Sequence, residues 1–224
     1  MKSIVLSLGG SVILSQNLGT SYFKKIATLL KKVSRDNKLF IVIGGGEIAR
    51  KYIKLGRQLG FDEKLLDLLG IDVTRINARF FNNILGNYNQ IVPFTIDEAS
   101  SLEKNIVVMG GTTPGHSTDM VGAELAEKNK ADLFIIATNV DGIFNKDPNE
   151  YQDAEKIPEV TIDELIDSFG TEWKNAGKNI VVDGPALKII KRAKLKTCVL
   201  NGKKLDQLEH AINFESFDGT MIIL

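Results

Sequence analysis

Three consecutive glycines, Gly44 to Gly46, are the residues of this chain best suited to hold an anion. They follow an uncharged apolar run that ends at Ile43, which predicts a strand buried on both faces. A residue without a Cβ lets the backbone approach a ligand closely. The segment after the glycines predicts a helix, whose free N-terminal N–H groups would face that ligand. The pattern therefore predicts an anion site at the strand end, with phosphate as the simplest ligand.

Two alternatives remain open for these glycines on local pattern alone. Gly44, Gly46 and Ala49 also match the loose GxGxxA pattern of dinucleotide-binding proteins. That fold needs a second strand ending in an acidic residue about 20 positions on, whereas residues 51–69 predict a helix. A tight turn without any ligand is the second alternative.

Three further predicted strands end in small or polar residues. These ends are Gly9-Gly10-Ser11, residues 110–119 and residues 139–142. The second, GGTTPGHSTD, offers four hydroxyl groups and an accessible backbone. Because the carboxyl ends of parallel strands meet at one edge of a sheet, four such ends predict a polyanion site far more strongly than one does.

Several single residues keep two interpretations. Asp67 lies among leucines of a predicted helix, where the spacing favours the solvated face over a site. Arg75 and Arg79 share a helical face, which suits a phosphate clamp less well than a solvated or subunit-contact surface. His116 suits a turn and a site equally. Asp119 is also a suitable N-cap for the helix predicted after it.

Strands and helices alternate along almost the whole chain, which predicts an open, mainly parallel sheet with helices on both sides. Residues 90–92 predict one short strand within this order. The 224 residues suit one large domain or two fused lobes. There is no GxxxxGK[ST] loop, which excludes a P-loop fold. Without CxxC or HExxH, no zinc site is predicted.

Composition narrows the class of protein. The 28 basic and 28 acidic side chains balance, which argues against nucleic acid or a membrane surface as the main partner. No apolar run approaches the roughly 18 residues of a membrane span, and the first residues are interrupted by glycine too soon for a secretory signal. The expected location is therefore cytoplasmic. Cys198 lies alone in an apolar run and is expected to be a core residue.

Six segments, taken in order, resemble the amino acid kinase superfamily and, within it, the archaeal-type uridylate (UMP) kinases. They are SLGGS, IGGGEIARKYI, DLLGI, MGGTTPGHSTD, ATNVDGIFNKDP and DGPALKII. The resemblance covers nearly the whole chain. It implies an α/β fold, a three-layer αβα sandwich with a mainly parallel central sheet. It further implies one domain over residues 1–224, with an acceptor (UMP) lobe at roughly 1–130 and an ATP lobe at roughly 131–224.

The resemblance implies reversible transfer of the ATP γ-phosphate to UMP, giving UDP and ADP in pyrimidine nucleotide synthesis. Mg²⁺ would accompany ATP, no separate protein metal site is expected, and the assembly would be a homohexamer, a trimer of dimers. No nucleic acid or membrane partner is expected. Other members phosphorylate carbamate or acetylglutamate. These activities, and a non-catalytic nucleotide-binding or storage role, are the alternatives.

The same resemblance implies roles for individual residues. The implied ATP-binding residues are Gly9, Gly10, Ser11, Gly46, Arg50, Thr138, Asn139, Phe144 and Asp147. The implied UMP-binding residues are Gly45, Asp67, Thr112, Thr113, Pro114, Gly115, His116, Ser117 and Thr118. The implied catalytic residues are Lys188, Arg50 and Asp183.

One position departs from the superfamily pattern. Many relatives carry lysine two residues before the first Gly-Gly pair, where this chain has Ser7. Our hypothesis is that Arg50, Lys188 and Mg²⁺ together balance the charge of the transferred group. The UMP phosphate is already an anionic nucleophile, so no general base is needed. Asp119 and Asp183 are expected to organise Mg²⁺-bound water or a lysine.

Overall fold

The computed structural model describes residues 1–13, 19–146, 148, 150–171 and 181–224. Its main sheet has seven strands in the order β3-β2-β1-β4-β8-β9-β7. These strands are β1 (Lys2–Leu8), β2 (Asn37–Ile43), β3 (Ile106–Met109), β4 (Leu133–Thr138), β7 (Glu159–Thr161), β8 (Thr197–Asn201) and β9 (Gly219–Ile223). All neighbours pair in parallel except β8 and β9. A separate antiparallel hairpin is formed by β5 (Ile143–Phe144) and β6 (Lys156–Ile157).

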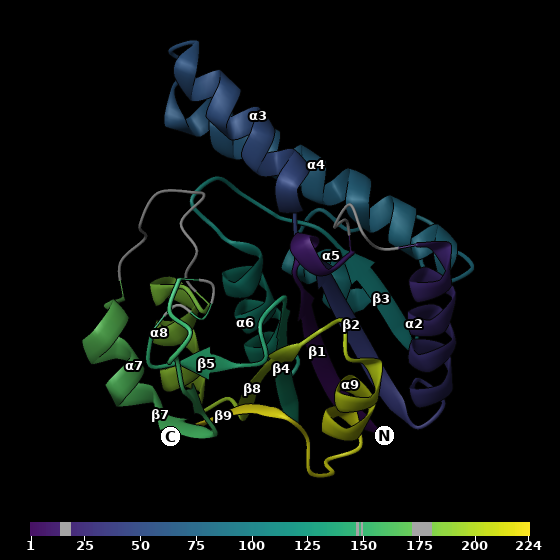
Figure 1. Cartoon of the computed structure of the whole chain (residues 1–224). Coiled ribbons are helices and arrows are strands. Elements are labelled where there is room, and N and C mark those ends of the chain that lie inside the picture. Colours follow the sequence, from purple (N-terminus) through teal and green to yellow (C-terminus); the bar gives the residue numbers. More distant parts are fainter. Residues whose placement is uncertain (14–18, 147, 149, 172–180) are drawn as a thin grey trace.

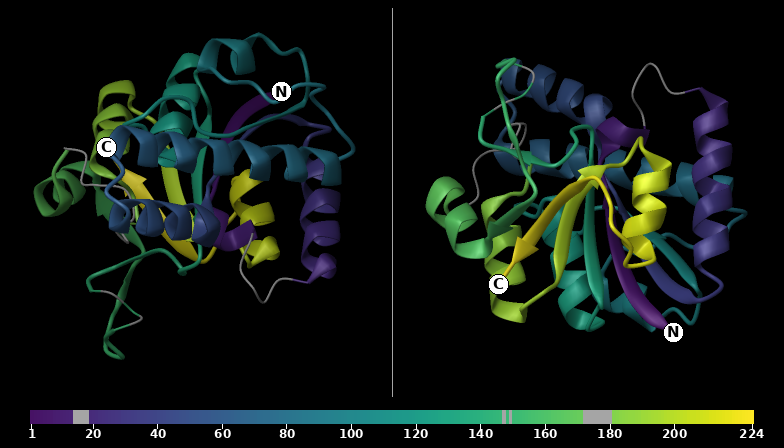
Figure 2. Two further views of the ribbon diagram at one scale, coloured as in Figure 1. Left: turned by 90° about the horizontal axis from the view of Figure 1, so that it is seen from above. Right: turned by 60° about the horizontal axis from the view of Figure 1, so that its bottom comes forward.

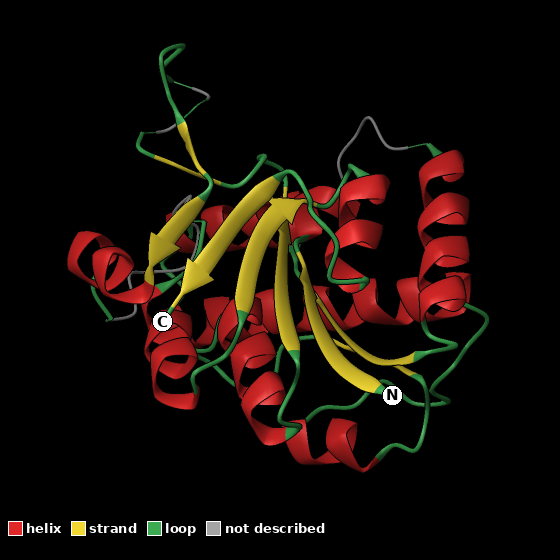
Figure 3. Cartoon of the chain, turned by 90° about the horizontal axis from the view of Figure 1, so that it is seen from below, coloured by secondary structure: helices red, strands yellow, loops and turns green. Residues whose placement is uncertain are grey.

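Helices cover both faces of the sheet (Figure 3). On one face lie α1 (Gly10–Ile13), α2 (Thr20–Val33), α9 (Leu205–Ile212) and the second half of α4 (Glu63–Ile84). On the other lie α5 (Ile96–Ser101), α6 (Thr118–Lys128), α7 (Ile162–Phe169) and α8 (Gly184–Ala193). The expected three-layer αβα sandwich with a mainly parallel sheet is confirmed.

Alternation along β1 directs side chains to both layers. Ile4, Leu6 and Leu8 belong to the core beneath α2, whereas Val5 belongs to the core beneath α6. Ser7 follows the same alternation, and a Cβ built on Gly122 of α6 would lie 3.5 Å from the Ser7 Cβ. Ser7, at the position where the resemblance implies a lysine, therefore points toward α6.

α3 (Gly46–Gln58) and the first half of α4 form a helical pair that extends beyond the sheet (Figure 1). The sequence predicts one helix over residues 51–69. The residues are helical, but they belong to two helices, α3 and α4, with a turn between them. The chain reverses at Gly60, whose φ of +80° favours glycine. Viewed from above, α4 lies across the end of the sheet where β1 and β2 finish (Figure 2).

Two smaller expectations have opposite outcomes. The strand predicted at residues 90–92 does not form. Instead, the Asn89 side chain exchanges two hydrogen bonds with the backbone of Val108 on edge strand β3, at 2.9 and 3.0 Å. Cys198 is fully buried, which confirms a core residue, and burial raises the pKa of its thiol to about 12.

No helix in the described part of the chain is both long and apolar enough to cross a bilayer.

Candidate active site

The two glycine-rich strand ends meet backbone to backbone. The amide of Gly44 donates to the carbonyl of Leu8 at 3.0 Å. A Cβ built on Gly10 would lie 2.1 Å from the amide nitrogen of Gly46, a distance that no side chain tolerates. Gly46 itself has a φ of +65° and begins α3. Glycine is thus required at both positions. We call residues 44–46 the glycine corner.

A cavity of about 540 Å³ opens at this edge of the sheet. It is bounded by the loops that follow β1, β2, β3 and β4, so the predicted convergence of strand ends on one rim is observed. The predicted site residues that line it are Gly9, Gly10, Ser11, Gly45, Gly46, Arg50, Asp67, Thr113, Gly115, His116, Ser117, Thr118, Thr138, Asn139 and Phe144.

Five predicted site residues are not among those that line the cavity. Thr112 and Pro114 belong to its wall loop but do not face it. Asp183 caps the N-terminus of α8 and accepts a hydrogen bond from the Ser117 hydroxyl. Lys188 is exposed on α8. Asp147 lies outside the described residues.

Asp67 faces the cavity rather than the solvated outside of α4. It is partly buried, and its Oδ2 accepts the amide N–H of Gly115 at 2.8 Å. The solvated-face interpretation taken from helical spacing is therefore wrong. This contact joins α4 to the 110–118 loop at its tip.

The interpretations of His116 and Asp119 can now be compared with their surroundings. The backbone of His116 closes a turn onto Thr113, while its ring lines the cavity with Nδ1 3.5 Å from Glu124 Oε2. Ser117, not Asp119, caps α6, because its side chain accepts the amide of Met120 at 2.9 Å. The N-cap interpretation of Asp119 is wrong.

Asp119, which lines the cavity, and Asp183, which does not, form an acidic pair. The Ser7 hydroxyl donates to Asp119 Oδ1 at 2.6 Å, and the Ser117 hydroxyl donates to Asp183. Burial raises the pKa of Asp119 to about 7; the charge of Asp183 adds to the rise, and the hydrogen bond from Ser7 opposes it. Burial also raises the pKa of Asp183, against hydrogen bonds from Ser117 and the Ala186 amide. Repulsion between the two ionised carboxylates would be relieved by a cation.

Arg75 does not form the phosphate clamp considered from its spacing. Its Nε donates to the Gly111 carbonyl at 3.2 Å and its Nη2 to the Thr112 carbonyl at 3.0 Å. The guanidinium also lies over the Phe94 ring, 4.3 Å from its centre. Arg75 thus holds the 110–118 loop from outside the cavity, while Arg79 is exposed.

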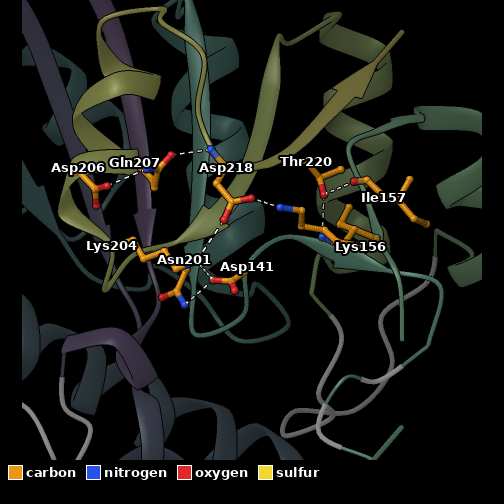
Figure 4. A network of polar contacts seen from close by, with 10 residues as sticks. Asp141, Lys156, Ile157, Asn201, Lys204, Asp206, Gln207, Asp218 and Thr220 are labelled. Carbon is orange, nitrogen blue, oxygen red and sulfur yellow. Dashed lines mark hydrogen bonds and ion pairs between the residues drawn. The ribbon is translucent and has the colours of Figure 1, made fainter. Parts of the chain in front are cut away.

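A polar network holds the β5–β6 hairpin (Figure 4). This hairpin brings Phe144 to the cavity. Lys204 Nζ lies 2.9 Å from Asp141 Oδ1 and 3.1 Å from Asp218 Oδ2. Lys156 of β6 forms an ion pair with the same Asp218. The wall after β4 is thereby tied to the loops that follow β8 and α9.

Sequence reasoning missed two kinds of lining residue. Thr74 lies inside α4, where helical spacing marks it only as a buried position. Lys146 lines the cavity beside Phe144 and forms an ion pair with Asp153 at 2.5 Å. The sequence could have identified Lys146, because this residue belongs to ATNVDGIFNKDP, one of the six segments that carry the resemblance.

Comparison with known proteins agrees with this geometry. Residues 2–201 match the amino acid kinase family. The chain is 45% identical over 204 residues to the uridylate kinase of Methanocaldococcus jannaschii, covering 89% of this chain and 90% of that protein. It is 42% identical over 223 residues to the uridylate kinase of Methanobrevibacter smithii, covering 98% of each.

Solved structures agree as well. The crystal structure of uridylate kinase from Archaeoglobus fulgidus superposes with a TM-score of 0.86 at 41% identity, over 99% of this chain and 100% of that one. The UMP kinase of Ureaplasma parvum gives a TM-score of 0.80 over 100% and 99% of the two chains. Its 20% identity supports the fold alone.

Proposed function

Because this chain belongs to the amino acid kinase family, we propose that it is a UMP kinase, which transfers the γ-phosphoryl group of ATP reversibly to UMP and gives ADP and UDP. The observation that carries the proposal is that the glycine corner, the 110–118 loop and the end of β4 border one shared cavity. Relatives named uridylate kinase share 42–45% identity with the chain, which supports UMP as the acceptor over carbamate or acetylglutamate.

The two nucleotides would enter from opposite walls of the cavity. ATP would lie along the ends of β1 and β4 and against Phe144, and UMP would lie along α4 and the 110–118 loop. We therefore keep the division into an acceptor lobe of roughly residues 1–130 and an ATP lobe of roughly residues 131–224. Phosphoryl transfer then requires in-line alignment and neutralised charge, with little covalent chemistry from the protein.

Mg²⁺ would arrive with ATP. Among the described residues, no group of three or more His, Cys, Asp or Glu side chains could hold a metal ion. Mg²⁺ in nucleotide sites is usually bound through substrate phosphates, water and one or two carboxylates. The Asp119–Asp183 pair fits that chemistry, acting through water bound to the ion. The ion would supply neutralisation of phosphate charge.

A coupled assay for ADP release tests the proposed reaction. UMP, CMP, carbamate and acetylglutamate are each supplied with ATP and Mg²⁺. UMP should give the highest kcat/KM, at least tenfold above CMP. Higher turnover of carbamate or acetylglutamate would contradict the proposal, and nucleotide binding without ADP release would favour the non-catalytic alternative.

Asp67→Asn should raise the KM for UMP about tenfold and leave kcat almost unchanged. The implied role of Asp67 is to accept the ribose hydroxyls, and an amide accepts them less strongly than a carboxylate does. Loss of such uniform binding changes KM rather than kcat. Calorimetric titration with UMP measures the change directly. Asp167→Asn, at an exposed position of α7, is the matched control. Unchanged UMP affinity would reject the ribose role.

The proposed assembly is a homohexamer built as a trimer of dimers in the cytoplasm, serving pyrimidine nucleotide synthesis. Exposed apolar side chains on the projecting helical pair support a protein contact there. They are Ile48, Tyr52 and Leu55 on α3, Leu59 just after α3, and Leu65 and Leu68 on the first half of α4. Exposed apolar surface of this kind marks interaction sites. Light scattering on the purified chain tests the mass, and a monomer would contradict the assembly.

A further inference from the structure

The inner face of α4 holds both loops between which the two nucleotides would react. Thr74 Oγ1 accepts the amide N–H of Gly111 at 2.6 Å and donates to the Ile71 carbonyl at 2.6 Å. One helical turn later, the Asn77 side-chain amide donates to the carbonyls of Gly44 and Gly45 at 2.9 and 3.3 Å. A single rigid helix thus sets the separation of the 110–118 loop from the glycine corner.

Close packing leaves the loop little freedom to shift on this helix. A Cβ built on Gly110 would lie 2.8 Å from Thr74 Oγ1 and 2.8 Å from the backbone nitrogen of Arg75. The loop backbone therefore lies directly against the backbone of α4. Thr74 and Gly111 are both buried, although both also border the cavity, so the hydrogen bond between the Gly111 amide and the Thr74 hydroxyl is largely shielded from bulk water. Arg75 contacts the same loop from the other side, through the carbonyls of Gly111 and Thr112.

We propose that Thr74 and Arg75 are positioning residues for the acceptor nucleotide, because they fix the 110–118 loop relative to the glycine corner that Asn77 holds. The inference rests on the proposed function, which places UMP on that loop. Neither residue is assigned a contact with a nucleotide. Their effect is on the position of the acceptor phosphate, and misplacement of reacting groups by about 1 Å is enough to slow transfer strongly.

Thr74→Val is the sharpest test. Valine keeps the branched shape but removes the hydroxyl, so the buried Gly111 amide loses its acceptor. The cost of an unpaired buried donor predicts a rise in the Kd for UMP of about tenfold or more. We also expect kcat to fall at least fivefold. The Kd for ATP should stay within threefold of wild type, because the glycine corner keeps its contact with Asn77.

Two further variants separate positioning from general stability. Thr74→Ser retains the hydroxyl and should restore UMP affinity to within threefold of wild type. Thr28→Val removes the same kind of hydrogen bond within a helix, from Thr28 to the Lys24 carbonyl at 2.9 Å, far from the cavity. It should change neither affinity. Calorimetric titrations with UMP and with a non-hydrolysable ATP analogue, together with steady-state kinetics and thermal melting, give every readout.

Arg75→Met keeps the test decisive if Thr74→Val does not fold. The arginine side chain is partly exposed at 19%, so its loss should be tolerated, and the Kd for UMP should rise at least threefold. The inference is overturned if folded variants at both positions bind UMP as wild type does. It is also overturned if Thr74→Ser is as impaired as Thr74→Val, or if ATP and UMP affinity fall equally. A wild-type chain that does not bind UMP overturns the proposed function as well.

Discussion

Replacing Lys188 with alanine should lower kcat by about 10²–10³, the usual loss when one well-placed donor to a developing charge is removed. The resemblance implies a lysine where this chain has Ser7, so we expect another cation to neutralise the transferred phosphoryl group. Arg50 and Lys146 line the cavity, but Lys146 already faces Asp153. Lys188 is exposed and makes no hydrogen bond or ion pair with the described part of the chain, so we expect its side chain to turn toward phosphates when they bind.

The position of α8 supports this expectation. Asp183, which caps α8, is hydrogen-bonded to Ser117 at the cavity wall, and Lys188 lies five residues further along. Lys191→Ala is the matched control, because Lys191 lies on the same helix and forms an ion pair with Asp163 at 2.5 Å. It should keep turnover within threefold. If Lys188→Ala also does so while Arg50→Met is inactive, the charge is carried by Arg50 and the assignment of Lys188 is wrong.

The glycine-rich strand ends, and their meeting at one edge of the sheet, could be predicted because the sequence patterns that indicate them are local. An uncharged apolar run followed by glycine specifies both a buried strand and a backbone free to approach its neighbour. The alternation of strands and helices then places all such ends on one edge. No tertiary information is needed for that step, and the contact between Gly10 and Gly46 is its direct result.

The contacts that hold the glycine corner and the 110–118 loop in place could not be predicted. Thr74 and Asn77 occupy ordinary inward positions of a helix, and each contacts a loop more than 30 residues away in sequence. Helical spacing identifies an inward position but not its partner. The same limit explains the strand wrongly expected at residues 90–92. There, the Asn89 side chain satisfies the backbone of the edge strand instead of another strand.

The solvated-face interpretation of Asp67 failed for a related reason. Helical spacing assumes that the polar face of a helix meets water. Here α4 lies across the sheet end (Figure 2), and Asp67 accepts a hydrogen bond from the 110–118 loop at Gly115. Only the resemblance carried by the DLLGI segment placed this carboxylate in the cavity. Its ribose role stays a prediction until the UMP titration of Asp67→Asn is made.

Asp119→Asn should make the free protein more stable above pH 7 while reducing its activity. The unfolded chain loses the Asp119 proton near pH 4, whereas the folded chain keeps it until the pKa of about 7. The folded state therefore binds more protons between these values, and the stability that this group contributes falls as pH rises through the window. Asparagine does not titrate, and its Oδ1 can still accept the hydrogen bond from Ser7.

The difference in the free energy of unfolding between Asp119→Asn and wild type should be near zero at pH 4. It should grow through neutrality and level off above pH 7. Its upper bound is about 4 kcal/mol. Cavity water and the coupling to Asp183 reduce the expected gain to about 1–3 kcal/mol. Urea unfolding at several pH values measures it, with Asp167→Asn on exposed α7 as the control. Turnover should fall at least tenfold, because the amide carries no charge to organise Mg²⁺-bound water or a lysine. If the free energies of unfolding of variant and wild type changed in parallel with pH, burial of the Asp119 carboxylate would cost the fold nothing. Unchanged turnover would show that Asp119 has no role in the reaction.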